Sequence, residues 1–83
     1  MRKVSRVKRN HKLFVYRMGL DGNIRHTLFD SALKFNLSIN QTYVNCKRFR
    51  QGIIKSVDIK GIDMTAQEYQ LSPAEIEKVI RGK

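Results

Sequence analysis

The spacing of apolar and polar residues predicts a β-rich segment near the start of the chain. Residues 12–18 are rich in strong β formers whose side chains would alternate between two faces. The sequence Gly-Leu-Asp-Gly-Asn at residues 19–23 is typical of a turn, and residues 24–26 would form a short return strand. We therefore expect a β-hairpin over residues 12–26.

A helix is predicted to begin at Thr27, because Asp30 follows it at the spacing of a capping box. Small Ala32 would let a second helix approach closely, and Asn36 tolerates the left-handed conformation that ends a helix. An apolar stripe at i, i+4 and i+7 supports this helix and consists of Leu28, Ala32 and Phe35.

A second helix is predicted from Ser38, its cap, to about Arg50, with Gly52 as its stop. Its expected inner stripe consists of Ile39, Tyr43, Cys46 and Phe49. Its opposite face carries side chains that read base edges or hold phosphates, namely Asn40, Gln41, Asn45, Lys47 and Arg48. Together the two helices have the layout of a helix-turn-helix.

Further along, Val57 and Ile59 alternate with polar residues, which predicts an extended segment or a small strand. Helical signals then return. Thr65 would open a second capping box and Ser72 a third, the latter with proline at the first helical position. We expect two short helices there.

The two predicted helix pairs resemble each other at a spacing of 34 residues, with Leu37-Ser38 matched by Leu71-Ser72. The second copy is expected to start its first helix about one turn later. Two diverged units are one interpretation, and chance similarity of two capped helix pairs is the other. The last helix has Ile76, Val79 and Ile80 on one side and Glu75, Glu77 and Lys78 on the other. Such an acidic face cannot readily lie against phosphates.

These elements give an α+β fold, in which a short β-hairpin is followed by a helix-turn-helix and a second short helix pair. Residues 1–11 are predicted to form a basic flexible arm. Residues 12–55 would be the hairpin and DNA-binding unit, and residues 56–83 a second small unit packed on it. The arm has little apolar periodicity, and its cations are Arg2, Lys3, Arg6, Lys8 and Arg9. A functionless, solvated terminus is the alternative.

The distribution of charged residues supports this division of the chain. The 83 residues include 17 Lys and Arg against 7 Asp and Glu, a formal charge of +10, so a polyanion is the expected partner. Residues 1–55 hold 13 of the cations and 2 acids, whereas residues 56–83 hold 4 cations and 5 acids. A basic membrane-surface helix is disfavoured, because the basic segments lack a Trp- or Leu-rich face.

Candidate catalytic and metal-binding residues are sparse, and we expect no enzyme, metal or cofactor. His11 and His26 have no cysteine or acid at ligand spacing. Cys46, the single cysteine, is expected to be a core residue. We find no membrane span or secretion signal, which predicts a protein of the host cytosol, associated with the nucleoid.

The segments Val15-Tyr16, Asp21-Gly22-Asn23-Ile24 and residues 27–38 resemble the nuclease-associated modular DNA-binding domain of phage and homing-endonuclease proteins. The resemblance covers residues 13–52. It implies a hairpin, a helix-turn-helix and sequence-specific DNA contact by the second helix, carried onto Asn40, Gln41, Asn45 and Arg48. Two features differ from that family. The stretch between Asn23 and Thr27 is shorter in this chain, and the helix after Ser38 is longer.

The predicted function is binding of double-stranded DNA by a phage or mobile-element transcriptional regulator or recombination accessory factor. Residues 39–50 would enter the major groove, with Lys47, Arg48 and Arg50 divided between phosphates and guanine edges. The five cations of the arm would bind DNA too, along the phosphates or in an adjacent minor groove. Two alternatives remain open. One is a phage-encoded inhibitor, such as an anti-CRISPR protein, that binds a host protein or its guide RNA complex through the same basic surface. The other is an RNA-binding protein, with Phe14, Tyr16 and Tyr43 as candidate stacking rings. The near-neutral segment after residue 55 suggests a further hypothesis, a homodimer or partner surface.

Overall fold

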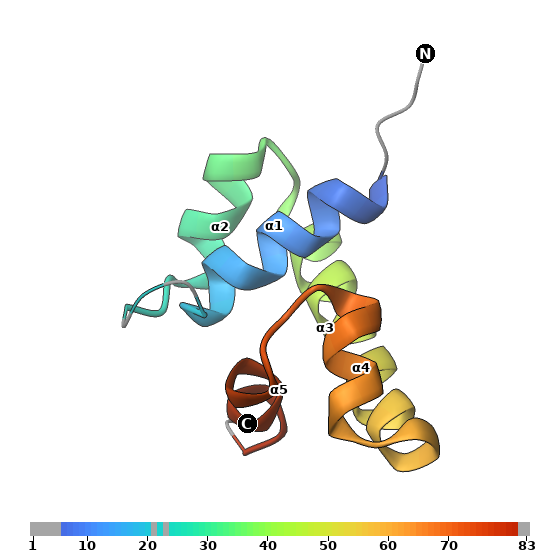
Figure 1. The fold of residues 1–83 in the computed structure, drawn as a ribbon. Coiled ribbons are helices and arrows are strands. Elements are labelled where there is room, and N and C mark those ends of the chain that lie inside the picture. Colours follow the sequence, from blue (N-terminus) through green and yellow to red (C-terminus); the bar gives the residue numbers. More distant parts are fainter. Residues whose placement is uncertain (1–5, 21, 23, 82–83) are drawn as a thin grey trace. The chain divides into compact units, whose positions relative to one another are not determined.

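The computed structural model describes residues 6–20, 22 and 24–81, and the side chains from Lys8 onward (Figure 1). These residues form five α-helices: α1 (Arg6–Met18), α2 (Leu28–Phe35), α3 (Ile39–Lys60), α4 (Ile62–Tyr69) and α5 (Pro73–Arg81). The chain divides into two compact units, unit 1 (Met1–Phe49) and unit 2 (Arg50–Lys83). This division lies inside α3, earlier than the boundary expected after residue 55.

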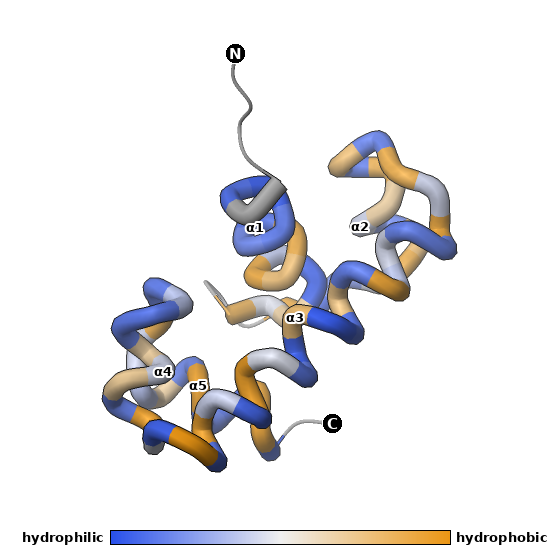
Figure 2. The backbone as a smooth tube through the Cα atoms, turned by 90° about the vertical axis from the view of Figure 1, so that its right-hand side faces the viewer, coloured by the Kyte–Doolittle hydropathy of each residue, from blue (hydrophilic) through white to orange (hydrophobic). Residues whose placement is uncertain are grey.

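The predicted α+β class is wrong, because the described residues contain no strand. Helix α1 covers residues 6–11, which were expected to belong to the flexible arm, and residues 12–18, which were expected to form the first strand of the hairpin. Leu13 and Phe14 explain why, since these neighbours are both buried. Neighbours in a strand point to opposite faces, whereas in a helix both can reach one core. Figure 2 shows the resulting pattern in α1, hydrophilic in its first half and hydrophobic further on.

The segment expected to be the hairpin turn instead ends α1. Gly19 has φ +69°, and its N–H donates to the Tyr16 carbonyl at 3.3 Å. The N–H of Leu20 donates to the Val15 carbonyl at 3.0 Å, which completes a Schellman motif. A Cβ at Gly19 would also lie 2.7 Å from the carbonyl carbon of Ile24, so a side chain is excluded both by conformation and by space.

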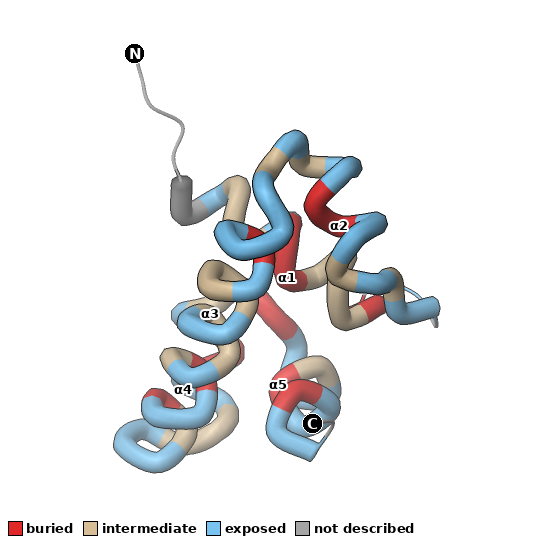
Figure 3. The backbone as a smooth tube through the Cα atoms, turned by 180° about the vertical axis from the view of Figure 1, so that it is seen from behind, coloured by how far each residue is buried: buried red, intermediate tan, exposed pale blue. Residues whose placement is uncertain are grey.

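Aromatic contacts dominate unit 1. The rings of Phe14 and Phe49 stack with centroids 4.7 Å apart, and those of Tyr16 and His26 stack at 3.8 Å. Arg17 donates from Nη1 to the His26 carbonyl at 2.6 Å, so the segment before α2 is fixed to α1. Figure 3 shows the buried stretches of α1 and α2.

α3 continues past Gly52, its predicted stop, and includes the segment expected to be extended. The buried residues Ile53 and Ser56 are three apart, and half-buried Val57 follows, a spacing typical of one helix face. A Cβ on Gly52 would lie 2.7 Å from the Tyr69 hydroxyl oxygen. The glycine therefore allows α4 to approach α3 closely, and this contact offsets its low helix propensity.

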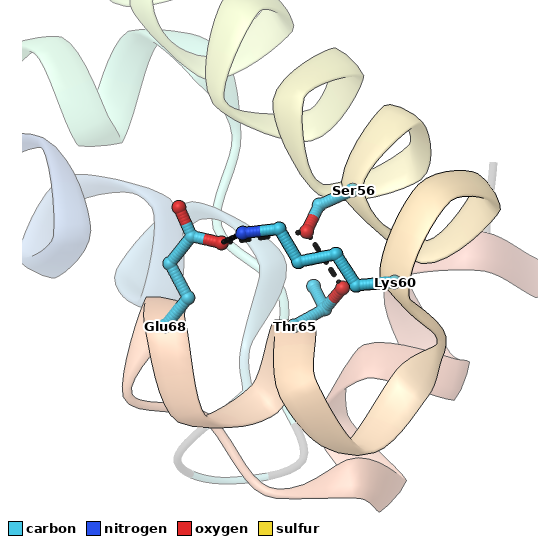
Figure 4. A network of polar contacts seen from close by, with 4 residues as sticks. All are labelled: Ser56, Lys60, Thr65 and Glu68. Atoms are coloured by element: carbon cyan, nitrogen blue, oxygen red, sulfur yellow. Dashed lines mark hydrogen bonds and ion pairs between the residues drawn. The ribbon is translucent and has the colours of Figure 1, made fainter.

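Unit 2 has an aliphatic core made of Ile53, Ala66, Leu71, Ile76 and Val79. The prediction that Thr65 caps a helix is wrong: Thr65 is fully buried within α4, whose N-cap is Gly61. The hydroxyl oxygens of Thr65 and Ser56 lie 2.7 Å apart and satisfy each other (Figure 4).

A charged pair borders these hydroxyl groups. Nζ of Lys60 donates to Oε1 of Glu68 at 2.6 Å, and the hydroxyl oxygen of Ser56 lies 3.5 Å from the same carboxylate oxygen (Figure 4). Burial raises the pKa of the neighbouring Tyr69, with Glu68 adding to the shift and Lys60 opposing it. Polar contacts thus join α4 to the last turns of α3.

Candidate nucleic-acid interface

The predicted turn between α2 and α3 is confirmed in its local details. Thr27 caps α2 by accepting from the Asp30 N–H at 3.0 Å. Asn36 adopts the left-handed conformation, with φ 56° and ψ 49°, and the Leu37 N–H donates to the Ala32 carbonyl at 2.9 Å. The chain therefore reverses between the two helices over residues 36–38.

Ser38 caps α3 through a reciprocal pair of hydrogen bonds. Its hydroxyl accepts from the Gln41 N–H at 3.0 Å, and its own N–H donates to Oε1 of Gln41 at 3.2 Å. The predicted cap is thus confirmed. Gln41, which was predicted to contact DNA, already uses its side-chain oxygen in this cap.

The predicted inner stripe of α3 is wrong at two positions. Ile39 is 48% exposed and Tyr43 is 51% exposed, whereas Thr42 is fully buried. The Thr42 hydroxyl donates to the Ser38 carbonyl at 2.9 Å, so burial leaves it satisfied. This bond lets a polar residue occupy the inward position, and the buried face is rotated from the one that apolarity alone indicated.

This rotation decides which predicted contact residues face solvent. Asn40, Gln41, Lys47 and Arg48 are exposed. Asn45 is half-buried, as is Arg50, which belongs to unit 2 and has its Nε buried without a hydrogen-bond partner. Unit 1 thus brings four of these side chains to the outer surface of the first α3 turns.

Tyr43 belongs to the same exposed surface, although it was expected on the inner stripe and was not among the predicted DNA contacts. The Lys47 Nζ lies 5.7 Å from the centre of its ring, within the range of a cation–π contact. The spacing of this tyrosine and lysine in the sequence, at i and i+4, could have predicted the contact, because residues four apart are neighbours on a helix surface.

The cations assigned to the arm fall into two groups. Arg2 and Lys3 lie outside the described residues, as does the Arg6 side chain. Lys8 and Arg9 belong to α1, which corrects the flexible arm over residues 6–11. Lys8 is exposed, whereas half-buried Arg9 donates to Oδ1 of Asn10 from two nitrogens, at 3.1 and 3.3 Å.

Three further features of the described part of the chain concern metal-binding clusters, the reactivity of its thiol and membrane-spanning helices. It contains no cluster of three or more histidine, cysteine or acidic side chains able to hold a metal ion. Burial raises the pKa of the half-buried Cys46 thiol above its usual 9.0, an effect that Arg17 partly opposes. Among the helices of residues 6–81, none has the length and apolar character needed to cross a bilayer.

Comparisons with family models, curated proteins and solved structures found no match to this chain. The resemblance to the nuclease-associated modular DNA-binding domain therefore stays a prediction. The hairpin that it implied is not found among residues 6–20, 22 and 24–26, because α1 occupies residues 6–18.

Proposed function

We propose that this chain is a non-enzymatic protein that binds double-stranded DNA through the first turns of α3 in unit 1. The observation that carries the proposal is the capped turn at residues 36–38, which leaves Asn40, Lys47 and Arg48 exposed on one helix. A helix held in this way, with polar and basic side chains outward, has the shape and chemistry that suit the major groove.

The distribution of charge supports a polyanionic partner for unit 1. Residues 1–49 contain 11 Lys and Arg against 2 Asp and Glu, giving +9, whereas residues 50–83 contain 6 against 5, giving +1. Phosphate contacts supply much of the affinity of DNA-binding proteins. Unit 1 therefore has the charge to bind DNA by itself.

Roles on the α3 surface follow from side-chain chemistry. Asn40 lies near the start of the helix and suits the paired donor and acceptor of adenine. Arg48 suits guanine, and Lys47, ordered over Tyr43, suits a phosphate or a guanine edge. Lys8 on α1 would hold phosphate. The finer role we propose is a phage or mobile-element regulator or recombination accessory factor, acting in the host cytosol.

The test measures affinity for a duplex selected from a randomised library and for random duplexes. Arg48→Ala should weaken binding to the selected duplex by about 1–3 kcal/mol and flatten sequence preference. Lys55→Ala is the matched control, because Lys55 is an exposed cation of the same helix in unit 2. Equal losses of affinity from both substitutions would show that Arg48 contributes only non-specific electrostatic attraction. Absence of duplex binding by the unmodified protein would refute the proposal.

A second candidate, the inhibitor of a host nucleoprotein effector, is favoured by apolar side chains on α2. Phe29 is 58% exposed and Leu33 is 67% exposed, and they are adjacent on the outer face at i, i+4. Replacing both by alanine should abolish capture of a host protein from nuclease-treated lysate while DNA affinity stays unchanged. Loss of DNA affinity alone would favour the first candidate.

A further inference from the structure

The turn of unit 1 recurs in unit 2, position by position, at an offset of 34 residues. Gln70 is left-handed, with φ 57° and ψ 45°, as Asn36 is. The Leu71 N–H donates to the Ala66 carbonyl at 2.9 Å, which repeats the bond between Leu37 and Ala32. α4 begins at Ile62, so the expected delay of one turn in the second copy is wrong.

The cap of the following helix recurs too. Ser72 accepts from the Glu75 N–H at 3.2 Å and donates from its own N–H to the Glu75 carboxylate at 2.8 Å, as Ser38 and Gln41 do. One carboxylate oxygen of Glu75 is therefore directed at the start of α5. Of the two acids expected on the outer face of α5, Glu77 is exposed, whereas Glu75 is half-buried and takes part in this cap.

The same positions face inward in both copies. Thr42 and Ile76 are offset by 34 and both fully buried, and Ala32 is buried as is its counterpart Ala66. Because one helix face is fixed inward, the opposite face must present equivalent positions outward. Asn40, Tyr43 and Lys47 correspond to Ala74, Glu77 and Arg81, all of them exposed.

The exposed pair of α5 combines an acceptor and a donor. Arg81 Nη2 lies 3.6 Å from Oε1 of Glu77, one helical turn away, and both side chains are more than half exposed. A carboxylate accepts from the cytosine amino group, and a guanidinium donates to guanine O6 and N7. The two side chains are thus complementary to cytosine and guanine edges in a major groove.

Resting on the proposed function, we propose that unit 2 is a second DNA reader, in which Glu77 recognises cytosine and Arg81 recognises guanine. With a charge of only +1, unit 2 gains little from phosphates and supplies sequence preference more than affinity. Attachment to the strongly basic unit 1 raises its effective concentration at the same DNA. The chain would then read two separate groups of base pairs, one for each unit.

Selection from a randomised duplex library with the full chain tests this. We expect two groups of preferred base pairs, one sensitive to Lys47→Ala and the other to Glu77→Gln. Glu77→Gln should lower preference for cytosine roughly tenfold within its group. It should also raise affinity for random duplexes, because a negative charge is removed.

Asp58→Asn is the matched control, since it removes an exposed negative charge of unit 2 outside α5. It should raise affinity for random duplexes while both groups of preferred base pairs persist. A single preferred group, or a second one unchanged by Glu77→Gln, would overturn the second reader and leave the function of unit 1 standing. Failure of the full chain to bind any duplex would overturn both proposals.

Discussion

Unit 1 and unit 2 contain the same reversal between two helices but surround it with different chemistry. At the shared inward position unit 1 has Thr42, whose hydroxyl bonds to a backbone carbonyl, and unit 2 has Ile76. Unit 1 packs aromatic rings such as Phe14 and Phe49, whereas unit 2 buries aliphatic side chains and a pair of hydroxyl groups. The reversal therefore does not depend on one type of core.

The features common to both units are local. Each has a left-handed residue, a leucine whose N–H bonds back to an alanine carbonyl, and a serine cap. These contacts fix the backbone within a few residues, so the surrounding core and surface are free to differ. Formal charge differs most, at +9 for residues 1–49 and +1 for residues 50–83.

The largest expected effect comes from breaking the aromatic core of unit 1. Phe14→Ala should lower the free energy of unfolding by about 3–5 kcal/mol, because it leaves a cavity beside Phe49. Phe29→Ala removes an exposed ring and should change the free energy of unfolding by less than about 0.5 kcal/mol. Urea unfolding followed by circular dichroism measures both, and similar losses would contradict the assigned core.

Substitution at the shared inward position compares the two cores directly. Ile76→Ala should cost about 2–5 kcal/mol through lost burial and a cavity. Thr42→Ala should cost only about 1–2 kcal/mol, from one hydrogen bond and one methyl group. The same unfolding measurement decides, and a larger loss at Thr42 would show that the polar position matters more than its contacts indicate.

The two units also differ at the start of their first helix. Thr27 caps α2 with its side chain, whereas Gly61 begins α4 with φ 90° and no side-chain cap. Gly61→Ala should cost about 1–3 kcal/mol, because that conformation is essentially restricted to glycine. Thr27→Ala should cost about 1 kcal/mol and Thr27→Gly only a few tenths. Thermal melting tests this order, and a tolerated Gly61→Ala would contradict it.

The smallest expected effect concerns Cys46 in unit 1. Because burial raises the pKa of its thiol, alkylation in the folded protein should be slower than in urea at pH 8, and should still accelerate above pH 9. The stability linked to this thiol is fully present below its unfolded pKa and falls as pH rises through the folded value. Cys46→Ala should remove that alkaline loss, and equal alkylation rates in both states would refute the burial.

Residues that act over a few positions could be predicted from the sequence. The caps at Thr27, Ser38 and Ser72 and the left-handed Asn36 are present as expected, because a side chain and the adjacent backbone suffice to form them. The repeat at 34 residues was visible too, although the first helix of its second copy begins one turn earlier than expected. Of the candidate interface, the exposure of Lys47 and Arg48 followed from the polar face of one helix.

Contacts between distant residues decided the rest. The segment around Leu13 and Phe14 has strand propensity, yet a helix lets both side chains enter one core. Gly52 signals a helix end, yet it lies inside α3, where its lack of a side chain leaves room for the Tyr69 hydroxyl group. The amino-acid sequence by itself determined the caps at Thr27, Ser38 and Ser72, the reversal at residues 36–38 and the division of charge. Only tertiary packing chose helix over strand and placed Thr42 inward, because the free energy of burial depends on partners far along the chain.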